Sequence, residues 1–525
     1  MSPYDTYTSP LATRNASPEM LRLWSARHKF NTWRRIWLAV AEAQLRMATT
    51  YVHRDRFTLP VTQEQVEELE AVVNRDGGIT DDEILLAAKY ERDLRHDVMA
   101  HVHALGDVCP KARPIIHLGM TSQDVVCNAD YVVLLESLWI IEMKLVRCVL
   151  ALAGSGADCK SLPCLGFTHY QPAQPCTVGR RFIQWASELE LARGRLGGTK
   201  DWIQPRGLKG ATGTQAAFME LLKDDELGVD LMEQDAVGRV VGPIGVRVFG
   251  VGTNRLLSYD FSIEWTTQTY PRVIDTFILA DLASVAAVLH KIATDIRLLS
   301  NRKELDEPFE DKQIGSSAMP YKRNPMRCER ICGLTRFVMN LVGNGYDTAA
   351  TQWLERTLDD SSNRRLSLPE AFLALDGALD LMHNVASGLI VHEAMVRKNL
   401  MAELPFMATE NVLMACVRAG GDRQEYHEII RVYAQAAGMR VKQEGLDNDL
   451  LDRLKADKAF WGKARGGPLA NELDWSEGPG GLLDPMRYVG RSVEQTERFI
   501  KEVVEPLRER YKDAMGGLGE SGPRV

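Results

Sequence analysis

The chain lacks the sequence patterns that mark most cofactor-dependent enzymes. Its 525 residues contain no P-loop, no glycine signature of a dinucleotide-binding fold and no G-x-S-x-G elbow. The nine cysteines are odd in number and include no C-x-x-C pair. Cys328 and Cys332 lie one helical turn apart, but no second pair completes a zinc site. We therefore expect reduced thiols and a reaction that needs neither a metal nor a cofactor.

The sequence also shows no targeting segment and no membrane-spanning segment. The first residues, MSPYDTYTSPLATR, lack the apolar stretch of a signal peptide, and no uncharged apolar run is long enough to cross a bilayer. The formal net charge is -8, so the surface as a whole should attract neither nucleic acid nor an anionic membrane. These features predict a soluble, cytoplasmic protein that acts on small molecules.

Long helices are expected in the middle of the chain. From Ile274 to Leu299, and again from Leu134 to Leu152, apolar residues follow one another in steps of three and four, which is typical of a helix bundle. The length of the chain suggests about two to four domains. The segment from Leu227 to Thr253 differs, because six glycines among valines predict a small β-like excursion or a flexible loop.

The most informative stretch is GSSAMPYKRNPMRCER, residues 315–330. Its two prolines disfavour a helix, and it brings serine hydroxyls together with several cations, a combination suited to a small anion. Asn324 can cap the following helix, and Pro325 fits the first turn of that helix. The free N–H groups of this helix end would then add to the anion site.

Four other polar clusters accompany this loop. FTHYQPAQP (167–175) places His169 on a segment that Pro172 and Pro175 keep from being helical, where an imidazole can donate a proton near neutral pH. RHDVMAHVH (95–103) reads as helical, and the spacing of its histidines argues against a preformed metal site. RTLDDSSNRR (356–365) offers helix-capping groups and arginine forks for carboxylate or phosphate, and SPLATRNASPEM (9–20) carries an arginine between two Ser-Pro turns. Each cluster alone could equally be a structural or solvated feature.

Together these segments resemble the fumarase/aspartase superfamily, whose signature loop GSS-x-MP-x-K-x-NP stands at residues 315–325 without departure. The other segments of the chain resemble the adenylosuccinate lyase family, and its animal and fungal type more than the shorter bacterial forms. These segments include SPLATR, RHDVMAHVH, FTHYQPAQ, GATGTQA and RTLDDSSNRR. The resemblance covers essentially the whole chain.

The resemblance implies an all-α, three-domain fumarase/aspartase fold. It places an N-terminal helical domain at residues 1–121, a central long-helix bundle at 122–391 and a C-terminal helical domain at 392–525. It also implies a homotetramer with active sites where three subunits meet. The implied reaction is the elimination of fumarate from adenylosuccinate, giving AMP, and from the succinyl-carboxamide ribotide of purine synthesis (SAICAR), giving AICAR.

The resemblance also implies roles for individual residues. Ser316 would be the general base and His169 the general acid. The implied substrate contacts are Arg14, Asn15, Arg95, His96, Asp97, Thr121, Ser122, Gln268, Lys322, Asn324, Arg330, Arg356, Ser361 and Arg365. A serine hydroxyl is a weak base until it ionises, so cations such as Lys322 have to lie nearby.

Two longer segments and one substitution depart from the family pattern. The glycine-rich segment at 227–253 and the segment around Ala48–Pro60 are longer than usual, and Met120 stands where the family often has alanine. Neither insertion interrupts a motif, so we expect altered loops or tetramer edges. Two alternatives stay open: a sister lyase, such as one acting on argininosuccinate, and a scaffold that has kept the fold but lost activity.

Overall fold

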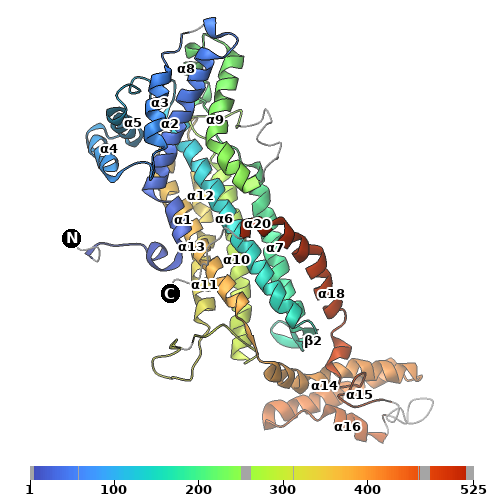
Figure 1. The fold of residues 1–525 in the computed structure, drawn as a ribbon. Coiled ribbons are helices and arrows are strands. Elements are labelled where there is room, and N and C mark those ends of the chain that lie inside the picture. Colours follow the sequence, from blue (N-terminus) through green and yellow to red (C-terminus); the bar gives the residue numbers. More distant parts are fainter. Residues whose placement is uncertain are drawn as a thin grey trace.

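The computed structural model describes residues 5–56, 58–249, 262–310, 312–458, 460 and 473–515. It is an elongated bundle of long helices (Figure 1), with smaller helical parts at its two ends. The all-α prediction is confirmed, since the described strands form only two short two-stranded sheets.

Six helices build the bundle: α6 (Ser122–Asp158), α7 (Val178–Trp202), α10 (Val273–Asn301), α11 (Met326–Asn340), α12 (Val342–Ala350) and α13 (Asp359–Ser387). The stripe predicted between Ile274 and Leu299 is buried along α10, where Ile278, Leu282 and Val285 are fully enclosed. Thr121 begins α6 with a capping box that it shares with Asp124. Both long helices expected from the sequence are therefore confirmed.

The N-terminal part consists of shorter helices at the upper end of the bundle in Figure 1. They are η2 (Leu11–Asn15), α1 (Pro18–Leu23), α2 (Ala26–Thr49), η3 (Arg54–Arg56), α3 (Gln63–Val73), α4 (Asp81–Leu94) and α5 (Asp97–Val108). Further along the chain come η4 (Ala211–Gly213), α8 (Ala216–Leu221) and α9 (Glu226–Phe249).

The prediction for residues 227–253 is wrong as far as Phe249, because these residues lie in α9; residues 250–253 are outside the described part of the chain. The buried valines Val237, Val240, Val241 and Val248 repeat at helical spacing and pack against α2. Burial of this face outweighs the low helix propensity of glycine and valine. The segment around Ala48–Pro60, which is longer than the family pattern, contains the end of α2 and the short helix η3.

Two short antiparallel sheets lie at the lower end of the bundle. The first is a hairpin of β1 (Pro163–Thr168) and β2 (Gln171–Thr177), and the second pairs β3 (Leu305–Asp306) with β4 (Ile390–Val391). The hairpin was not expected from the sequence, although its prolines correctly excluded a helix there.

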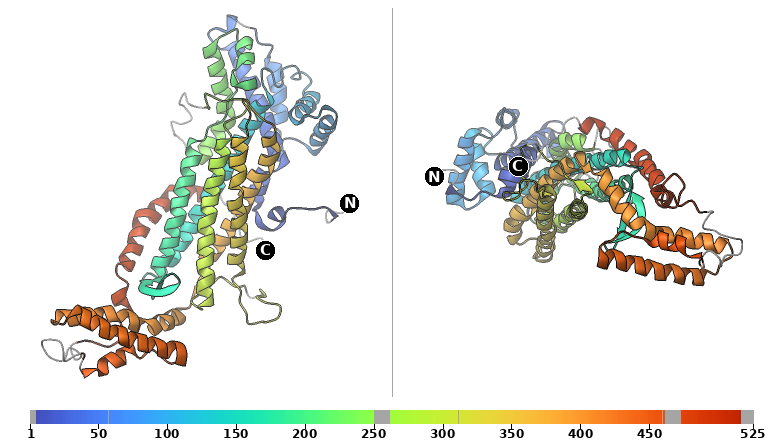
Figure 2. Two further views of the ribbon diagram at one scale, coloured as in Figure 1. Left: turned by 180° about the vertical axis from the view of Figure 1, so that it is seen from behind. Right: turned by 90° about the horizontal axis from the view of Figure 1, so that it is seen from below.

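The C-terminal part has a separate apolar core formed mainly by α14 (Glu393–Arg418), α15 (Arg423–Met439) and α16 (Leu450–Ala456). The right-hand view of Figure 2, which looks at the molecule from below, shows α14 and α15 projecting sideways from the bundle. The chain continues through η6 (Arg440–Glu444), η8 (Pro485–Tyr488), α18 (Ser492–Phe499), η9 (Ile500–Val504), α19 (Glu505–Arg510) and α20 (Lys512–Met515). The last four of these return the chain along the bundle, where the buried Tyr511 donates a hydrogen bond to Glu142 of α6.

Two described helices, α10 and α14, are long and apolar enough to cross a membrane by length and composition alone. Helix α10 packs against α7, α11, α12 and α13, and more than half of its most apolar window is buried. A core helix of a bundle passes the same test, so the apolar character of α10 is explained by its packing.

Candidate functional site

A polar cleft of about 830 Å³ opens at the upper end of the bundle, between α2, α5, the start of α6, the start of α10 and the start of α13. Eight of the predicted substrate residues line it: Arg95, His96, Asp97, Ser122, Gln268, Arg356, Ser361 and Arg365. Four segments far apart in the sequence therefore meet at one site.

The junction of α4 and α5 fixes one wall of the cleft. Arg95 has a left-handed backbone with φ of 54°, which turns the chain between the two helices. His96 is the N-cap of α5: its Nδ1 accepts a hydrogen bond from the backbone N–H of Met99 at 3.2 Å. Its Nε2 lies 3.3 Å from the hydroxyl of Ser122, so the α5 cap contacts the start of α6 directly.

Gln268 joins three segments on another wall. Its Nε2 donates to the hydroxyl of Thr121 at 2.9 Å, and its Oε1 accepts from the backbone N–H of Thr212 at 3.0 Å. With both ends of its amide engaged, the Gln268 side chain is held in place beside the Thr121–Ser122 pair.

Buried ion pairs support the floor of the cleft. Arg364 donates to Asp275 at 2.6 Å and to Asp130 at 2.9 Å, and Arg272 donates to Asp360 at 2.8 Å. These carboxylates compensate the charges of the buried arginines, so the pairs order the helix starts around the cleft.

The positive charges of the arginines nearer to solvent are less fully balanced by carboxylates. Arg365 donates to Asp97 at 2.7 Å, but its side chain is 56% exposed. Burial opposes ionisation of Asp97, yet the hydrogen bond and charge of Arg365 outweigh it and lower the pKa of that carboxyl. Arg95 has no carboxylate within ion-pair distance among the described residues, which leaves its guanidinium available to an anion.

The cleft residues that the sequence analysis missed include Lys29, Gln123 and Arg272. Burial, and next the charge of Arg365, lower the pKa of Lys29, which also lies 4.7 Å from the centre of the Trp33 ring. Lys29 belongs to an ordinary amphipathic helix, so no local signal could have marked it.

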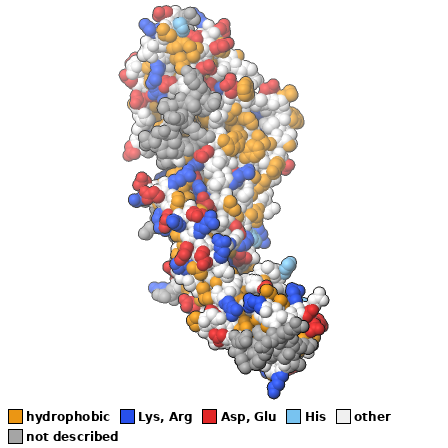
Figure 3. All heavy atoms as spheres, turned by 90° about the vertical axis from the view of Figure 1, so that its right-hand side faces the viewer, with side chains coloured by type: hydrophobic (Ala, Val, Ile, Leu, Met, Phe, Trp, Pro, Cys, Tyr) orange, Lys and Arg blue, Asp and Glu red, His pale blue; other side chains and the backbone are white. Residues whose placement is uncertain are grey.

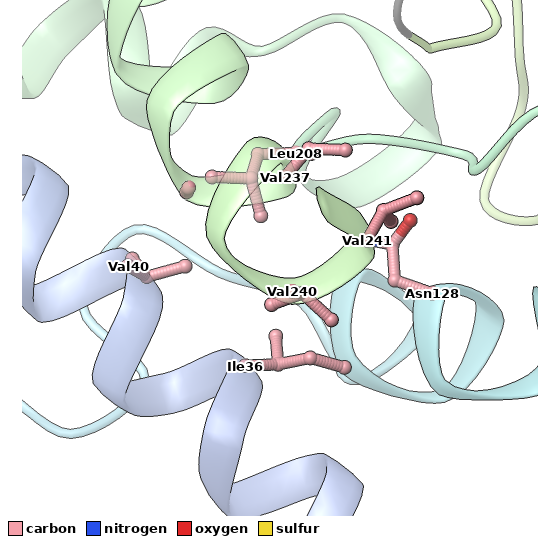
Figure 4. Close-up of a pocket in the computed structure, with 8 residues that line it drawn as sticks. Ile36, Val40, Asn128, Leu208, Val237, Val240 and Val241 are labelled. Carbon is pink, nitrogen blue, oxygen red and sulfur yellow. The ribbon is translucent and has the colours of Figure 1, made fainter. Parts of the chain in front are cut away.

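A second hollow, between α2, α6 and α9, is apolar and has a cavity volume of only about 10 Å³. Figure 4 shows Ile36, Val40 and Val240 facing one another across it, with Asn128 at the side. It has room for about one water molecule, so it is a packing gap and no substrate site.

The signature loop closes on itself at the lower end of the bundle. Asn324 donates from Nδ2 to the carbonyl of Gly315 at 2.9 Å, which ties the two ends of the loop together. A Cβ at position 315 would lie 2.1 Å from the carbonyl oxygen of Lys322, so only glycine allows this approach. The loop is therefore a closed ring.

Ser316 lies inside this ring. Its Oγ accepts hydrogen bonds from the backbone N–H groups of Ala318 at 3.4 Å and Met319 at 3.2 Å. Two donors pointing at one hydroxyl oxygen favour its ionised form. Lys322 is exposed and has no carboxylate within ion-pair distance among the described residues, so its ammonium is available nearby.

The sequence-based expectation for the helix that follows is wrong. Asn324 does not cap α11; it bonds to Gly315 instead, and Pro325 is the N-cap without a side-chain hydrogen bond. The carboxylate of Glu307 accepts from the N–H groups of Arg327 at 2.9 Å and Cys328 at 3.1 Å. The helix end thus already holds an anion of the same chain, and these N–H groups do not add to a substrate site. The serines and aspartate at the start of α13 likewise provide no side-chain cap, since Leu358 is its N-cap.

His169 lies at the tip of the β1–β2 hairpin. Thr168 pairs with Gln171, so the turn has only two residues, and both His169 and Tyr170 take positive φ angles of 54° and 57°. The tight turn leaves the imidazole exposed. Tyr170 places the tip along the bundle, because its hydroxyl lies 3.5 Å from the carbonyl of Leu298 near the end of α10.

Arg14, Asn15 and Arg330 form a third group between these two ends. Asn15 packs against Gly377 of α13, which has no room for a side chain there. Burial, and then the like charges of Arg14 and Arg327, lower the pKa of Arg330. A bound anion would relieve this repulsion between guanidinium groups.

The polar cleft and the hairpin tip do not meet within one subunit. Arg272, in the wall of the cleft, is the N-cap of α10, whereas the hairpin tip contacts Leu298 near the other end of the same helix. At 1.5 Å per residue, the 26 residues between them span roughly 39 Å. Figure 1 accordingly places α5 and β2 at opposite ends of the bundle.

Comparisons with known proteins agree over nearly the whole chain. The family model described as "Lyase" matches residues 12–223 and 262–340, and the model "Adenylosuccinate lyase C-terminus" matches residues 405–499. The adenylosuccinate lyase of Saccharomyces cerevisiae is 44% identical over 504 residues and that of Schizosaccharomyces pombe 45% identical over 508 residues. Each alignment covers 96% or 97% of both chains. The adenylosuccinate lyase of Schistosoma mansoni is 41% identical over 519 residues, with 98% of both chains covered.

Solved structures share the fold at lower identity. The 3-carboxy-cis,cis-muconate lactonizing enzyme of Pseudomonas putida superposes with a TM-score of 0.73 at 21% identity, covering 95% of this chain and 99% of that one. A fumarate lyase of Mesorhizobium sp. BNC1 gives a TM-score of 0.72 at 20% identity, covering 95% and 100%.

Proposed function

The chain belongs to the adenylosuccinate lyase family, and we propose that it eliminates fumarate from adenylosuccinate and from SAICAR, leaving AMP and AICAR. The observation that carries this proposal is the near full-length identity of 41–45% to adenylosuccinate lyases. The site geometry supports it, because cations and hydroxyls gather where a dianionic succinyl group and a phosphate could bind.

The elimination needs two proton movements. A base removes a proton from the carbon next to a carboxylate, which places extra negative charge on that carboxylate, and an acid protonates the departing nitrogen. Ser316 is proposed as the base: the backbone N–H groups of Ala318 and Met319 stabilise its alkoxide, and Lys322 offers an uncompensated charge in the same loop. The exposed imidazole of His169 is proposed as the acid.

The polar cleft is proposed to bind the substrate away from the reacting bond. Thr121 and Ser122 suit the succinyl group, and Arg95 and Arg365 suit a carboxylate or phosphate oxygen. Arg14 and Arg330 form a second cationic group for the other end of the substrate.

We propose that the active site is shared between subunits of a homotetramer. The roughly 39 Å between cleft and hairpin exceeds the length of the substrate, so one subunit cannot bring both to one molecule. Large apolar side chains are exposed on bundle helices, including Leu191, Trp202, Phe277 and Phe337, and offer a surface for further copies of the chain. Figure 3 shows apolar areas gathered on the upper half of one face of the molecule.

The function is tested with the purified protein after treatment with a chelator. Incubation with adenylosuccinate should release AMP and fumarate in equal amounts, and SAICAR should release AICAR and fumarate. Turnover of argininosuccinate instead would favour the sister lyase, and no turnover of any of the three by a folded protein would favour the inactive scaffold.

The shared site is tested by mixing. A His169→Gln protein and a Ser316→Ala protein, each inactive alone, should regain part of the activity after their subunits are exchanged. Each variant mixed with itself is the control, and verified exchange without recovery would refute the contribution of His169 and Ser316 by different subunits.

A further inference from the structure

Two cysteines face each other across the hairpin that carries His169. Cys164 of β1 and Cys176 of β2 are direct partners in the strand register, and their Sγ atoms lie 3.6 Å apart. Directly opposed residues of antiparallel strands have Cα atoms about 4.5–5.5 Å apart, within the range of about 4.4–6.8 Å that a disulfide requires. The backbone therefore already has the spacing of a disulfide.

The surroundings favour a reactive thiolate at one of the two positions. Cys164 is fully buried, whereas Cys176 is partly exposed. Nη2 of Arg181, on α7, lies 4.0 Å from Sγ of Cys176 and also donates to the carbonyl of Leu165. The hydrogen bond from the Cys164 thiol, together with the charge of Arg181, lowers the pKa of Cys176, and a thiolate is the nucleophile in thiol–disulfide exchange.

The other cysteines lack this combination. All nine are described and free, and of the remaining seven, six are fully buried. The seventh, Cys159, is partly exposed, but burial raises the pKa of its thiol. Cys159 is therefore a matched control for exposure without activation.

We propose that Cys164 and Cys176 are a redox-sensitive modification site, which closes reversibly to a disulfide and thereby displaces the tip of the hairpin. The part of this proposal that concerns turnover rests on the proposed function. In a reducing compartment, a disulfide of this kind is transient and reports the redox state.

The oxidant is a small-molecule disulfide such as oxidised glutathione. The Cys176 thiolate attacks one of its sulfurs, which breaks the S–S bond, releases one glutathione thiolate and leaves a mixed disulfide on Cys176. Cys164 then loses its proton and attacks Sγ of Cys176, and the second glutathione leaves as a thiolate. Two protein thiols are oxidised to one disulfide, and one glutathione disulfide is reduced to two thiols.

Bond formation changes the geometry of the hairpin. The two sulfurs must approach from 3.6 Å to about 2.0 Å. Between this pair and the tip lies the irregularity at Leu165–Phe167, where a Cβ on Gly166 would meet the carbonyl of Gln174. The strands have little free space to absorb the change there, so we expect it to reach His169.

The test starts from the folded, reduced, full-length protein. It is incubated with oxidised glutathione, alkylated to trap the remaining thiols, and analysed by mass spectrometry. We expect the loss of two hydrogens per chain and a peptide that links Cys164 to Cys176. Cys164→Ser should stop at glutathionylated Cys176, Cys176→Ser should react far more slowly, and Cys159→Ser should still form the bond.

Turnover of adenylosuccinate is measured on the same samples. A displacement of about 1 Å at a catalytic group can cost about 100-fold, so we expect kcat of the oxidised form to fall by at least about tenfold. Excess reduced glutathione should restore it, and the double variant Cys164→Ser/Cys176→Ser should not respond to the oxidant.

Each outcome decides one part of the proposal. If Cys164 and Cys176 stay alkylatable, or if another pair forms, the modification site is refuted. If the bond forms and kcat is unchanged, the coupling to His169 is refuted. Absence of turnover in the reduced protein would refute the proposed function instead, and bond formation would still be measurable.

Discussion

The cleft at α5 and the loop between β3 and α11 both present cations, but they hold them in different ways. In the cleft, Arg364 and Arg272 are buried and paired with carboxylates from neighbouring helices. In the loop, Lys322 is exposed, and the hydrogen bonds that shape the ring come from the loop itself. The cleft is thus ordered by the fold of the subunit, whereas the loop can respond to a substrate or to another subunit.

Because of this difference, substitutions in the cleft and in the loop should affect the stability of the subunit and the rate of turnover differently. Changes in the cleft should reduce the stability of the subunit as well as binding, because its arginines connect α6, α10 and α13. Changes in the loop should reduce turnover and leave stability nearly unchanged. The following predictions test that division.

The largest effect is expected from the two groups proposed to move protons. Ser316→Ala and His169→Gln should each lower kcat by about 10²–10⁴-fold, the usual contribution of general acid–base catalysis. The thermal unfolding midpoint should change little, because Ser316 bonds only within its loop and His169 is exposed. Ser317→Ala removes a neighbouring hydroxyl and is the matched control; equal losses for both serines would refute the assignment.

A pair of charge deletions should separate the two regions most clearly. Arg364→Met leaves Asp275 without its buried partner and should lower the free energy of unfolding by about 3–5 kcal/mol. Lys322→Met removes an exposed charge and should leave unfolding unchanged while lowering kcat. Denaturant titration and steady-state kinetics on both variants measure this, and similar unfolding losses would contradict the comparison.

Gly315→Ala tests whether the loop has to form a closed ring. The added Cβ would lie 2.1 Å from the carbonyl of Lys322, and overpacking of this kind typically costs about 1–3 kcal/mol. We expect the exposed loop to open instead of bearing this strain, so kcat should fall about tenfold to 100-fold while the unfolding midpoint changes little. Gly333→Ala, in α11, has open space at its Cβ and is the control.

The smallest effect is the pH dependence of the Asp97–Arg365 pair. Because the pKa of Asp97 is lowered in the folded state, the pair contributes stability above the ordinary pKa of about 4 and loses it as the pH falls through the lower, folded value. The contribution is below about 1 kcal/mol because Arg365 is largely exposed. Arg365→Gln should be slightly less stable than the wild type at pH 7 and equally stable at pH 2; a gap that persists at pH 2 would contradict this.

Local sequence patterns predicted several parts of the fold correctly. The three-and-four spacing gave α10 within two residues, and the prolines around His169 correctly excluded a helix. The spacing of Val237, Val240, Val241 and Val248 also favours a helix, and burial of this face outweighs the glycines, which favour a loop. The motif residues of the cleft do lie together, although their roles stay predictions.

The features that the sequence did not predict depend on contacts between residues far apart in the chain. The cap of α11 comes from Glu307, which precedes the helix by almost twenty residues, and no local pattern favours it over Asn324. Lys29 and Arg272 enter the cleft only because α2 packs against α6 and α10 packs against α13. The pairing of Cys164 with Cys176 depends on the register of a hairpin that the sequence did not predict.

By itself, the sequence determined the family, the helical bundle and the residue types that can move protons and hold anions, because periodicity and motifs are local properties of the chain. Only the tertiary structure decided which of these residues lie together. The rigid length of α10 separates the polar cleft from His169, and backbone contacts close the ring around Ser316. Rise per residue and strand register determine such separations, and both become distances only when the helices and strands are packed.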